Sequence, residues 1–454
     1  MTDAAARQRQ AYEALTRTGN DAPFISERPA LFSPAAAAQD DVNPKGVFGR
    51  FAQLLLPMEY TAWAEESQAH VRSAYLGDWT SLNKVSVQGR QALEFLSQAG
   101  LNDLSRFAIG QVKHHVQLDA DGRVASEGVV YRAGEEEFVY TAGSCDWLVW
   151  QFSQGSWDAE IADISPETFI FGVQGPASLF ILEQATGESL RAIAFNHSRP
   201  ASVGGAAVRV LRTGISGELG YELHGSADDA DQVWRAVAAA GRDFGLRLLG
   251  LRSQPVQHIE AGIATNGMDY LPAAIITPGA PTQFRRGSAG GSFIPLGGVT
   301  DYFRKPGELG WGPRVLPAHD FLGRDALAAD ASVGGPDRVL VGLTWNAADV
   351  TGVLASLLAG GDVPEQMDMP RLQGPSFDQV LSGDVPVGVS TGRTVSPTLR
   401  AMISLCVISR DHAAPGTEVT VIWGRPGTPQ RDIRATVTAL PFKPDRRRTD
   451  VTTR

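Results

Sequence analysis

The chain has 454 residues, 43% of them hydrophobic, with 49 glycines and 27 prolines, a composition typical of a globular α/β-type protein with room for two or three domains. Its formal net charge is −10 and its one contiguous basic run is three arginines at 446–448, which argues against a nucleic-acid partner. It has no run of about 18 apolar residues and no apolar signal core near its start, so neither a membrane span nor export is predicted.

Cysteine and histidine usage predicts neither a disulfide nor a metal centre. Cys145 and Cys406 lie far apart in segments with a buried-strand pattern, so a disulfide between them is not expected and a reducing, cytoplasmic location is. His114 and His115 are adjacent on a predicted strand and therefore point to opposite faces. No third ligand is spaced to complete a metal site with them.

The chain opens with a predicted extension of residues 1–46, in which residues 4–17 have helical spacing and a polar run containing proline follows. The extension either packs on the body, mediates dimer contacts or is disordered, and the sequence leaves monomer and homodimer open. The body begins with alternating strand and helix patterns. Its first predicted elements are a strand at 84–89, a helix at 90–99, strands at 112–118 and 128–131 joined by a turn at 119–122, a strand at 137–142 and a helix at 145–154.

A near repeat of that pattern follows, which predicts a pseudo-duplicated core of two related αβ lobes within residues 47–330. The repeat consists of a strand at 169–173, a helix at 176–184, strands at 207–211 and 221–224, and a helix at 227–240. From 331 to 446 the pattern changes to strands and glycine- or proline-containing turns, which indicates a separate β-rich domain before a tail at 447–454. Its predicted strands lie at 339–345, 385–392, 401–408, 418–423 and 433–440.

The most informative segment, residues 212–223, reads R-T-G-I-S-G-E-L-G-Y-E-L. Gly214, Gly217 and Gly220 permit positive φ angles and a close approach of the backbone to a ligand. The alternation that follows is that of a strand entering a sheet. A carboxylate at that strand can accept two parallel hydrogen bonds from a ring with an N–H beside an NH₂ group, as in a pterin. The alternative interpretation is a tight turn with surface glutamates.

This segment resembles the signature of the glycine cleavage T-protein (aminomethyltransferase) superfamily, and further segments resemble that superfamily in the same order. They are V-Q-G-P-A at 173–177, I-E-A-G at 259–262 followed by Gly267 and Asp269, V-G-V-S-T-G at 387–392 and S-P-T-L at 396–399. The resemblance runs from Tyr60 to Phe442. It implies an α+β fold, the three-domain cloverleaf with two related αβ lobes and a C-terminal β-barrel domain. It also implies tetrahydrofolate as the cofactor, bound in the central hole.

Within that superfamily, residues 302–312 and 319–327 resemble the tetrahydrofolate-dependent aryl O-demethylases of the vanillate, syringate and dicamba type. T-proteins have an acidic, threonine-rich run where this chain has Y-L-P-A-A at 270–274. They also have an essential aspartate where this chain has Ser126. These departures argue against an aminomethyl-lipoyl substrate.

The resemblance assigns the folate side of the site to a group of polar residues around the glycine-rich segment. Glu222 is expected to clamp the pterin, with Gln174 at the same ring and Tyr221 or Glu218 shaping the loop. For Gln174 the alternative is a turn amide that caps the following helix. Glu260 lies in the segment that closes the cavity, and its alternative is a buried structural carboxylate.

On the methyl-donor side, Gln254 stands where vanillate-type enzymes have a tyrosine and T-proteins an arginine. Its amide can hydrogen-bond a phenolate but cannot act as an acid. His258 is the nearest group suited to proton transfer near neutral pH, and it shares a face with Gln254 and Glu260 if this segment is extended. The alternative for His258 is a satisfied core histidine. The other expected substrate contacts are the apolar walls Trp79, Trp147 and Ile263, and Arg132 or Arg252, with Arg123 as a third candidate, as the cation for a benzoate.

The sequence therefore predicts a methyltransferase that moves a methyl group from a methoxylated aromatic acid to N5 of tetrahydrofolate. Transfer of a methyl or aminomethyl group from sulfur or nitrogen is the second interpretation, and a folate-binding accessory protein is the third. The accessory branch of the superfamily carries a K-G-C-Y segment after the second lobe, whereas this chain has no cysteine between Cys145 and Cys406.

Overall fold

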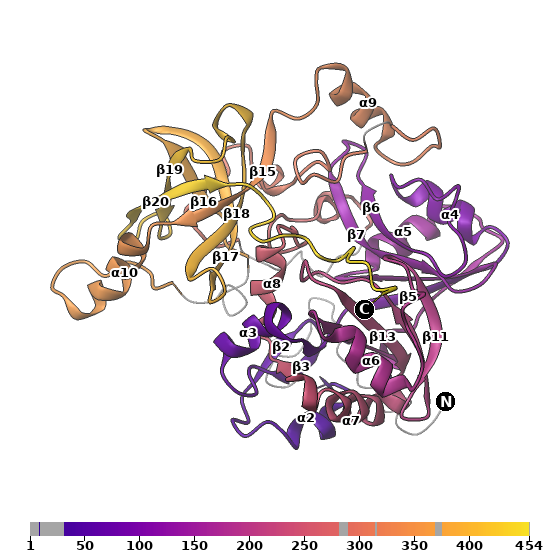
Figure 1. Cartoon of the computed structure of the whole chain (residues 1–454). Helices are drawn as coiled ribbons and strands as arrows, with labels where there is room; N and C mark the ends of the chain where they lie inside the picture. Colours follow the sequence, from indigo (N-terminus) through magenta and orange to yellow (C-terminus); the bar gives the residue numbers. More distant parts are fainter. Residues whose placement is uncertain (1–8, 10–30, 281–288, 314–315, 368–374, 454) are drawn as a thin grey trace.

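The computed structural model describes residue 9 and residues 31–280, 289–313, 316–367 and 375–453, so the predicted helix at 4–17 lies outside the described residues apart from Arg9. Two α/β lobes and a closed β-barrel make up the molecule, and the chain after the barrel runs back to the lobes (Figure 1). The predicted α+β fold with two related lobes and a C-terminal barrel is confirmed.

The first lobe is an antiparallel sheet with two helices on one face. Its elements are β5 Asn83–Gln88, α4 Ala92–Ala99, β6 Val112–Leu118, β7 Val124–Arg132, β8 Glu137–Ala142, α5 Asp146–Ser153 and β9 Glu160–Asp163. The strand order is β6-β7-β8-β5-β9. Because alternate strand residues share a face, Val85, Val130 and Phe138 meet Phe95 of α4 and Leu148 of α5 in one core.

The second lobe repeats this plan. Its elements are β4 Tyr75–Asp78, β10 Thr168–Gln174, α6 Ser178–Thr186, β11 Ser198–Val203, β12 Ala206–Leu211, β13 Gly220–Ser226, α7 Ala230–Ala240 and β14 Arg247–Leu249. The strand order β11-β12-β13-β10-β4-β14 is that of the first lobe with β4 inserted beside β14. Phe171, Leu223 and Trp234 lie in its core beneath α6 and α7, and the predicted duplication is thus visible in the topology.

The two lobes meet through equivalent backbone segments at the starts of β6 and β11. The N–H of Val112 donates to the carbonyl of Asn196 at 2.8 Å, and the N–H of Ser198 donates to the carbonyl of Gly110 at 2.6 Å. This reciprocal pair relates the lobes by a pseudo-two-fold axis. Val112 packs beside it with Tyr131 of the first lobe and Leu211 of the second.

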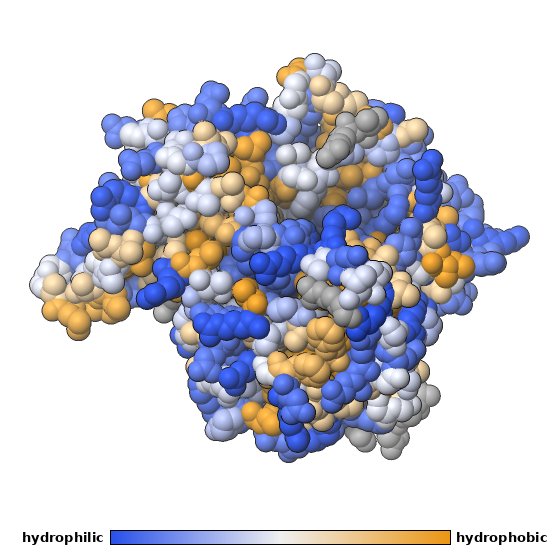
Figure 2. All heavy atoms as spheres, in the orientation of Figure 1, coloured by the Kyte–Doolittle hydropathy of each residue, from blue (hydrophilic) through white to orange (hydrophobic). Residues whose placement is uncertain are grey.

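The barrel follows α9 Arg324–Ser332 and closes in the order β15-β18-β17-β16-β19-β20. Its elements are β15 Arg338–Trp345, α10 Ala347–Ala355, β16 Asp378–Ser382, β17 Val385–Ser396, β18 Ala401–Ser409, β19 Glu418–Trp423 and β20 Arg431–Thr438. Leu343, Val380, Val421 and Ile433 fill its interior. Figure 2 shows an apolar surface patch at the place of α10, where Leu354 is exposed.

The remaining elements lie against the second lobe and position the site. They are β1 Leu31–Phe32, α2 Ala36–Asp40, β2 Phe48–Phe51, β3 Leu54–Pro57, α3 Trp63–Arg72 and α8 Gln254–Glu260. The N–H of Ala38 in α2 donates to Asp231 of α7 at 2.6 Å, and β1 pairs with β3. The described part of the predicted extension therefore packs on the body.

Both cysteines, Cys145 and Cys406, are buried free thiols, and burial raises the pKa of Cys406 to about 12. Among the helices that the structure describes, none has both the length and the apolar character needed to cross a membrane.

Candidate active site

The predicted site residues on strand β13 lie on opposite faces of the second lobe's sheet. Tyr221 and Leu223 point into the core beneath α6 and α7, where Tyr221 is fully buried. Residues one position apart on a strand point to opposite faces, so Glu222 lies on the other face together with His224. The Tyr221 side chain thus lies in the core, on the opposite side of the sheet from Glu222, and its role in shaping the loop stays a prediction.

Two glycines make room for aromatic rings beside Glu222. Gly172 of β10 lies opposite Glu222 in the ladder, and Gly77 of β4 lies opposite Gly172. A Cβ added at Gly172 would lie 2.7 Å from Nε1 of Trp79, and one added at Gly77 would lie 3.2 Å from the ring of Tyr75. Close approach of this kind is a usual reason for glycine within a strand. The structure thus brings the predicted wall residue Trp79 to the same sheet face as Glu222.

The carboxylate of Glu222 lies where the two lobes meet. Its Oε2 is 3.2 Å from Nε2 of His224, and the His224 ring meets the ring of Tyr131 edge-on at 5.6 Å between centroids. The Glu222 side chain is 22% exposed, whereas that of His224 is 8% exposed. Glu222 is therefore an acceptor that a ligand can reach, held beside a largely buried histidine.

Gln174 uses its amide to hold the glycine-rich loop. Its Nε2 donates to the carbonyl of Thr213 at 3.1 Å and to that of Tyr221 at 3.3 Å, and its Oε1 accepts from the hydroxyl of Ser216 at 3.0 Å. A Cβ at Gly214 would lie 1.9 Å from Oε1 of Gln174, and one at Gly220 would lie 2.2 Å from the same atom. The glycines are thus required by the side chain of Gln174, and Gln174 ties this loop to β10.

Glu218 also supports the loop from within the protein. It is buried, and its Oε1 lies 3.0 Å from Nζ of Lys443, which also donates to the carbonyl of Ser216 at 2.7 Å. The N–H of Arg446 donates to the carbonyl of Gly217 at 2.8 Å. The chain after the barrel therefore clamps the loop. These contacts agree with a loop-shaping role for Glu218, whose carboxylate has Lys443 as its partner in place of a ligand.

Residues 254–260 form the helix α8, so the extended conformation considered from the sequence is wrong. Pro255 stands in the first turn, where its fixed φ favours a helix start and its missing N–H removes no helical bond. Gln254 and His258 are four residues apart and share a helix face. Glu260, two residues after His258, points elsewhere.

Glu260 joins three parts of the protein. Its Oε2 lies 3.0 Å from Nε2 of His70 in α3, its Oε1 accepts from the hydroxyl of Ser396 in β17 at 2.6 Å, and its side chain is fully buried. These contacts favour the structural alternative for Glu260, with side-chain partners on α3 and the barrel. Gln254 instead donates to the carbonyl of Asp78 at 3.3 Å, directly before Trp79.

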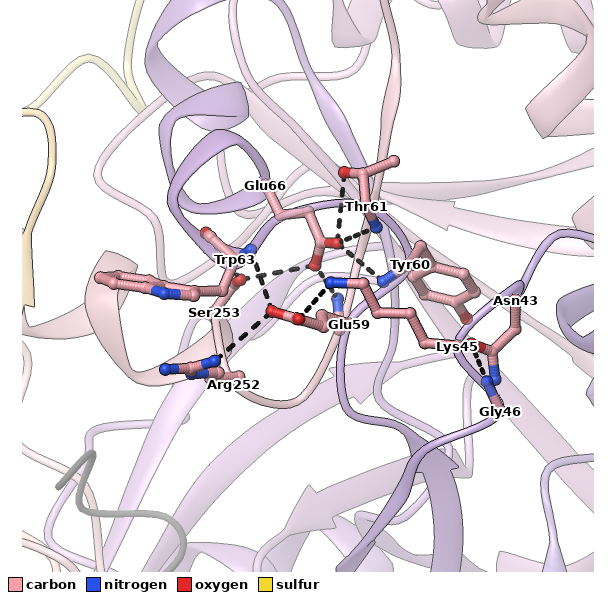
Figure 3. A network of polar contacts seen from close by, with 11 residues as sticks. Asn43, Lys45, Gly46, Glu59, Tyr60, Thr61, Trp63, Glu66, Arg252 and Ser253 are labelled. Atoms are coloured by element: carbon pink, nitrogen blue, oxygen red, sulfur yellow. Dashed lines mark hydrogen bonds and ion pairs between the residues drawn. The ribbon is translucent and has the colours of Figure 1, made fainter.

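Arg252 belongs to a polar network between α3 and the start of α8 (Figure 3). Its guanidinium lies 3.7 Å from Glu59 and over the ring of Trp63 at 5.3 Å. Glu66 accepts from backbone N–H groups in the same network, at 2.7 Å from Thr61 and 2.9 Å from Gly250. The Arg252 guanidinium is thus already paired, although 39% of the Arg252 side chain is exposed.

The structure does not gather the other predicted substrate contacts with Trp79. Arg132 donates to the carbonyls of Phe107 at 2.7 Å and Glu135 at 2.6 Å, and it lines a separate pocket of about 420 Å³ in the first lobe. Trp147 packs with Phe303 in a different cluster from that of Trp79. Ile263 follows α8 and is half-buried. Backbone carbonyls thus occupy the Arg132 guanidinium, and its role as the cation for a benzoate stays a prediction.

Two residues on the Glu222 face, His224 and Tyr75, were not predicted from the sequence. His224 could have been predicted from the sequence, because it follows Glu222 by two residues and such residues share one face of a strand. Tyr75 carried none, because the short strand β4 had not been predicted.

These features define a class of protein with two related α/β lobes and a C-terminal barrel, in which a glycine-rich loop lies beside an accessible carboxylate. The crystal structure of glycine cleavage system aminomethyltransferase T from Bartonella henselae has this fold. The two chains superpose with a TM-score of 0.68 at 19% identity, over 91% of this chain and 98% of that one.

Sequence comparison narrows the class to a family. Residues 39–275 match the GCVT N-terminal domain. The chain is 36% identical to sesamin methylene transferase of Sinomonas sp. (strain No.22), over 89% of this chain and 94% of that protein. It is 28% identical to syringate O-demethylase of Sphingobium sp. (strain NBRC 103272 / SYK-6), over 85% and 90%, and 30% identical to an aminomethyltransferase of Saccharopolyspora erythraea, over 87% and 94%. The chain belongs to the GCVT aminomethyltransferase family.

Membership makes it an enzyme of the methyl or aminomethyl transfer kind, with tetrahydrofolate as the cofactor used across its homologues. The residues present fit that cofactor. Glu222 offers a reachable carboxylate for the paired N–H donors of a pterin, and Oε1 of Gln254 is a buried acceptor without a partner among the described residues.

Proposed function

We propose that this protein is a tetrahydrofolate-dependent O-demethylase that transfers a methyl group from a methoxylated aromatic acid to N5 of tetrahydrofolate. The products are a phenol and 5-methyltetrahydrofolate. The observation that carries the proposal is the placement of Trp79 and Tyr75 on the same face as the reachable carboxylate of Glu222. Two flat apolar rings beside a pterin clamp suit a planar aromatic donor, and one relative is named for removing a methyl group from syringate.

The protein's part in such a reaction is mainly binding and alignment. Tetrahydrofolate supplies the nucleophilic nitrogen when bound. Glu222 orients it through the pterin edge, and Gln174 with the Lys443–Glu218 pair fixes the loop that follows β12. Holding two reactants in line lowers the entropic part of the barrier, while Trp79 and Tyr75 keep water from the reacting centre.

The leaving oxygen needs support as the C–O bond breaks, because the bonding electron pair stays on it. Gln254 and His258 lie one turn apart on α8, and we assign them to this oxygen. The Gln254 NH₂ group stabilises negative charge there, and His258 delivers a proton. The phenol gains one proton and the cofactor nitrogen loses one, so the reaction balances. Arg252, two residues before Gln254, is the cation retained for the acid group of the substrate.

A second candidate is methylene transfer from a methylenedioxyphenyl ring. The specific observation in its favour is the 36% identity to sesamin methylene transferase over 89% of the chain. In that reaction both C–O bonds of the ring acetal break, and the products are a catechol and 5,10-methylenetetrahydrofolate. Two aryl oxygens then leave in turn, and in this candidate Gln254 and His258 serve them one after the other.

Mass spectrometry of anaerobic mixtures separates these candidates. The protein and tetrahydrofolate are incubated with vanillate, syringate, anisates, dicamba or sesamin, with the Glu222→Ala variant as control. The proposal expects 5-methyltetrahydrofolate and a phenol. A catechol with 5,10-methylenetetrahydrofolate supports the second candidate. Tight tetrahydrofolate binding without transfer from any of these compounds contradicts both and favours a sulfur or nitrogen donor or an accessory role.

A further inference from the structure

Asp78 ends β4 with a carboxylate that points away from the Glu222 face. Neighbouring strand residues alternate between the two faces of a sheet, so Asp78 shares the side of Leu76 and of Phe171, its partner in the ladder, which lie in the core beneath α6 and α7. Asp78 is 4% exposed. A carboxylate removed from water in this way depends on hydrogen bonds for its stability, and its donors come from distant parts of the chain.

Two of the donors belong to the segment that contains α2. The hydroxyl of Ser33 donates to Oδ2 of Asp78 at 2.5 Å, and Nε2 of Gln39 in α2 donates to the same oxygen at 2.7 Å. The Ser33 oxygen accepts from the N–H of Ala35 at 3.1 Å, so the single hydroxyl hydrogen is left for Asp78. Hydrogen bonds to a charged acceptor are stronger than neutral ones. These two bonds therefore tie residues 33–39 to the end of β4.

The same end of β4 leads directly into the site. Oδ1 of Asp78 accepts from the backbone N–H of Thr80 at 2.9 Å, a side-chain turn that fixes the backbone on both sides of Trp79. The backbone N–H of Trp79 donates to the carbonyl of Ile170 at 2.8 Å, and its ring meets that of Phe51 edge-on at 6.3 Å between centroids. The carboxylate of Asp78 thus holds the backbone that carries an aromatic wall of the site.

The backbone carbonyl of Asp78 sets the orientation of the Gln254 amide. Nε2 of Gln254 donates to it at 3.3 Å, and Gln254 is 1% exposed. A carbonyl oxygen can only accept, so this contact requires the NH₂ end of the amide, rather than its oxygen, to face Asp78. One N–H is used there, and the plane of the amide then fixes the direction of the second N–H. A turn of the Asp78 peptide would therefore redirect the donor that Gln254 offers to a ligand.

We propose that Asp78 is a positioning residue for the methyl-donor side of the site. Its carboxylate, held by Ser33 and Gln39, locks the peptide whose carbonyl orients Gln254, so that the second N–H of that amide meets the leaving oxygen. This rests on the proposed function, in which Gln254 supports that oxygen. A donor that is aligned before the reaction need not be reorganised during it, so residues 33–39 contribute to turnover without touching a reactant.

The test removes a donor to Asp78 and leaves Asp78 in place. Gln39→Met keeps the length and the helix propensity of the side chain but cannot donate. Asp231→Ala is the matched control, because it removes the acceptor of the Ala38 N–H and so loosens the same helix α2 at its contact with α7. Both variants should lower Tm by about 2 °C. Only Gln39→Met should lower kcat for the preferred donor, by about tenfold to 100-fold, with tetrahydrofolate affinity unchanged in both.

A double-mutant cycle shows whether Asp78 acts through Gln254. In the Gln254→Met background, Gln39→Met should cause no further loss in kcat/KM, because the amide that Asp78 orients is gone. The exchange of Gln39→Glu with Asp78→Asn restores a carboxylate–amide pair of reversed polarity and should recover most of the activity. An equal fold-loss from Gln39→Met in both backgrounds would overturn the positioning role, as would equal losses of kcat in Gln39→Met and Asp231→Ala.

Crystal structures without substrate test the same inference apart from the reaction. In Gln39→Met the Gln254 amide should leave hydrogen-bonding distance of the Asp78 carbonyl, whereas in Asp231→Ala it should stay. An undisturbed contact between Gln254 and Asp78 in Gln39→Met would overturn the proposal, whatever group the enzyme transfers. Failure of the proposed function is distinct: the wild-type protein would transfer no group from any aryl ether, while Gln39→Met would still show the displaced amide.

Discussion

The two lobes share one topology, yet only the second carries the candidate site. Their equivalent turns follow β5 and β10 and read Gln88-Gly89 and Gln174-Gly175, with φ of 127° and 133° at the glycines. Gln88 is exposed, whereas Gln174 is buried beneath the loop it holds. The linker before β8 is residues 133–136, and the linker before β13 is the longer 212–219. The lobe that carries the candidate site therefore differs from the other lobe by a longer loop and a buried glutamine.

The strands that carry these turns, and the strands paired with them, also differ between the two lobes. The ladder registers Gln88↔Glu137 and Gln174↔Gly220 make Val139 the counterpart of Glu222 and Ser86 the counterpart of Gly172. Val139 packs in the cluster between the lobes, beside Tyr131. The first lobe thus contributes an apolar wall, and the second contributes the charge and the space for aromatic rings. The two lobes thus have sheets of similar topology whose facing side chains differ in kind.

The largest effect is expected when Glu222 of β13 is replaced by valine, the residue at the equivalent position of β8. Glu222→Val should weaken tetrahydrofolate binding by about 100-fold or more, because a charge-assisted pair of hydrogen bonds is lost. Valine favours strands, so the fold should persist. Calorimetry measures the affinity, and Glu137→Val on the exposed end of β8 is the matched control, with affinity unchanged. Wild-type affinity in Glu222→Val would remove the clamp assignment.

The next effect concerns the chain after the barrel, which holds the loop of the second lobe through Lys443 and Arg446. Lys443→Met leaves Glu218 buried without its cation, and we expect a loss of about 3 kcal/mol in the free energy of unfolding. Tetrahydrofolate affinity should fall as well, because the loop loses its anchor. Denaturant titration measures the first and calorimetry the second.

A double variant sharpens this prediction. Lys443→Met with Glu218→Gln removes the isolated charge and should recover much of the stability, since the two side chains are directly coupled. Lys443→Arg should recover tetrahydrofolate affinity in part. Full stability in Lys443→Met alone would mean that the ion pair does not support the loop.

Much of the fold could be predicted because each lobe has regular patterns of its own. The strand at 112–118 is β6 in full, and the strand at 137–142 is β8, since strict alternation and turn residues mark both ends. Other segments gave weaker patterns: the strands β1, β2, β3, β4, β9, β11, β14 and β16 were not predicted, and the helix at 254–260 was considered as an extended segment. The repeat of strand and helix patterns was enough to show the duplication.

The site was predictable only where the signal is local. The glycines of the 212–223 segment and the reachable Glu222 follow from residue type and spacing. Lys443 could not be found, because it meets Glu218 from 225 positions away. The burial of the Tyr221 side chain could not be predicted, because a single strand pattern does not tell which face meets the core. The hydrogen bonds of Arg132 could not be predicted, because the carbonyls that bind its guanidinium come together only on folding.

A smaller effect is expected from replacing one glycine by alanine beside the equivalent loop of each lobe. Gly220→Ala places a Cβ 2.2 Å from Oε1 of Gln174 and should displace that amide, with about tenfold weaker tetrahydrofolate binding and a loss of about 1–3 kcal/mol in stability. Gly134→Ala in the first lobe meets only the Glu137 side chain at 3.1 Å, which can move aside. Equal losses in both variants would mean that Gln174 does not organise the site loop.

The effect that is smallest at neutral pH belongs to the first lobe, because it appears only at acid pH. Burial lowers the pKa of His115 from 6.5 to about 4, and its Nε2 lies 2.8 Å from the carbonyl of Leu96.

Above pH 6.5 the imidazole is neutral in both the folded and the unfolded chain, so His115 confers no pH dependence there. As the pH falls from 6.5 toward 4, the unfolded chain takes up a proton that the folded chain excludes, and the free energy of unfolding falls by up to about 3 kcal/mol. His115→Gln should flatten this slope in urea titrations between pH 7 and 4, while His412→Gln on the barrel should keep it. A slope unchanged by His115→Gln would place the acid sensitivity outside the core of the first lobe.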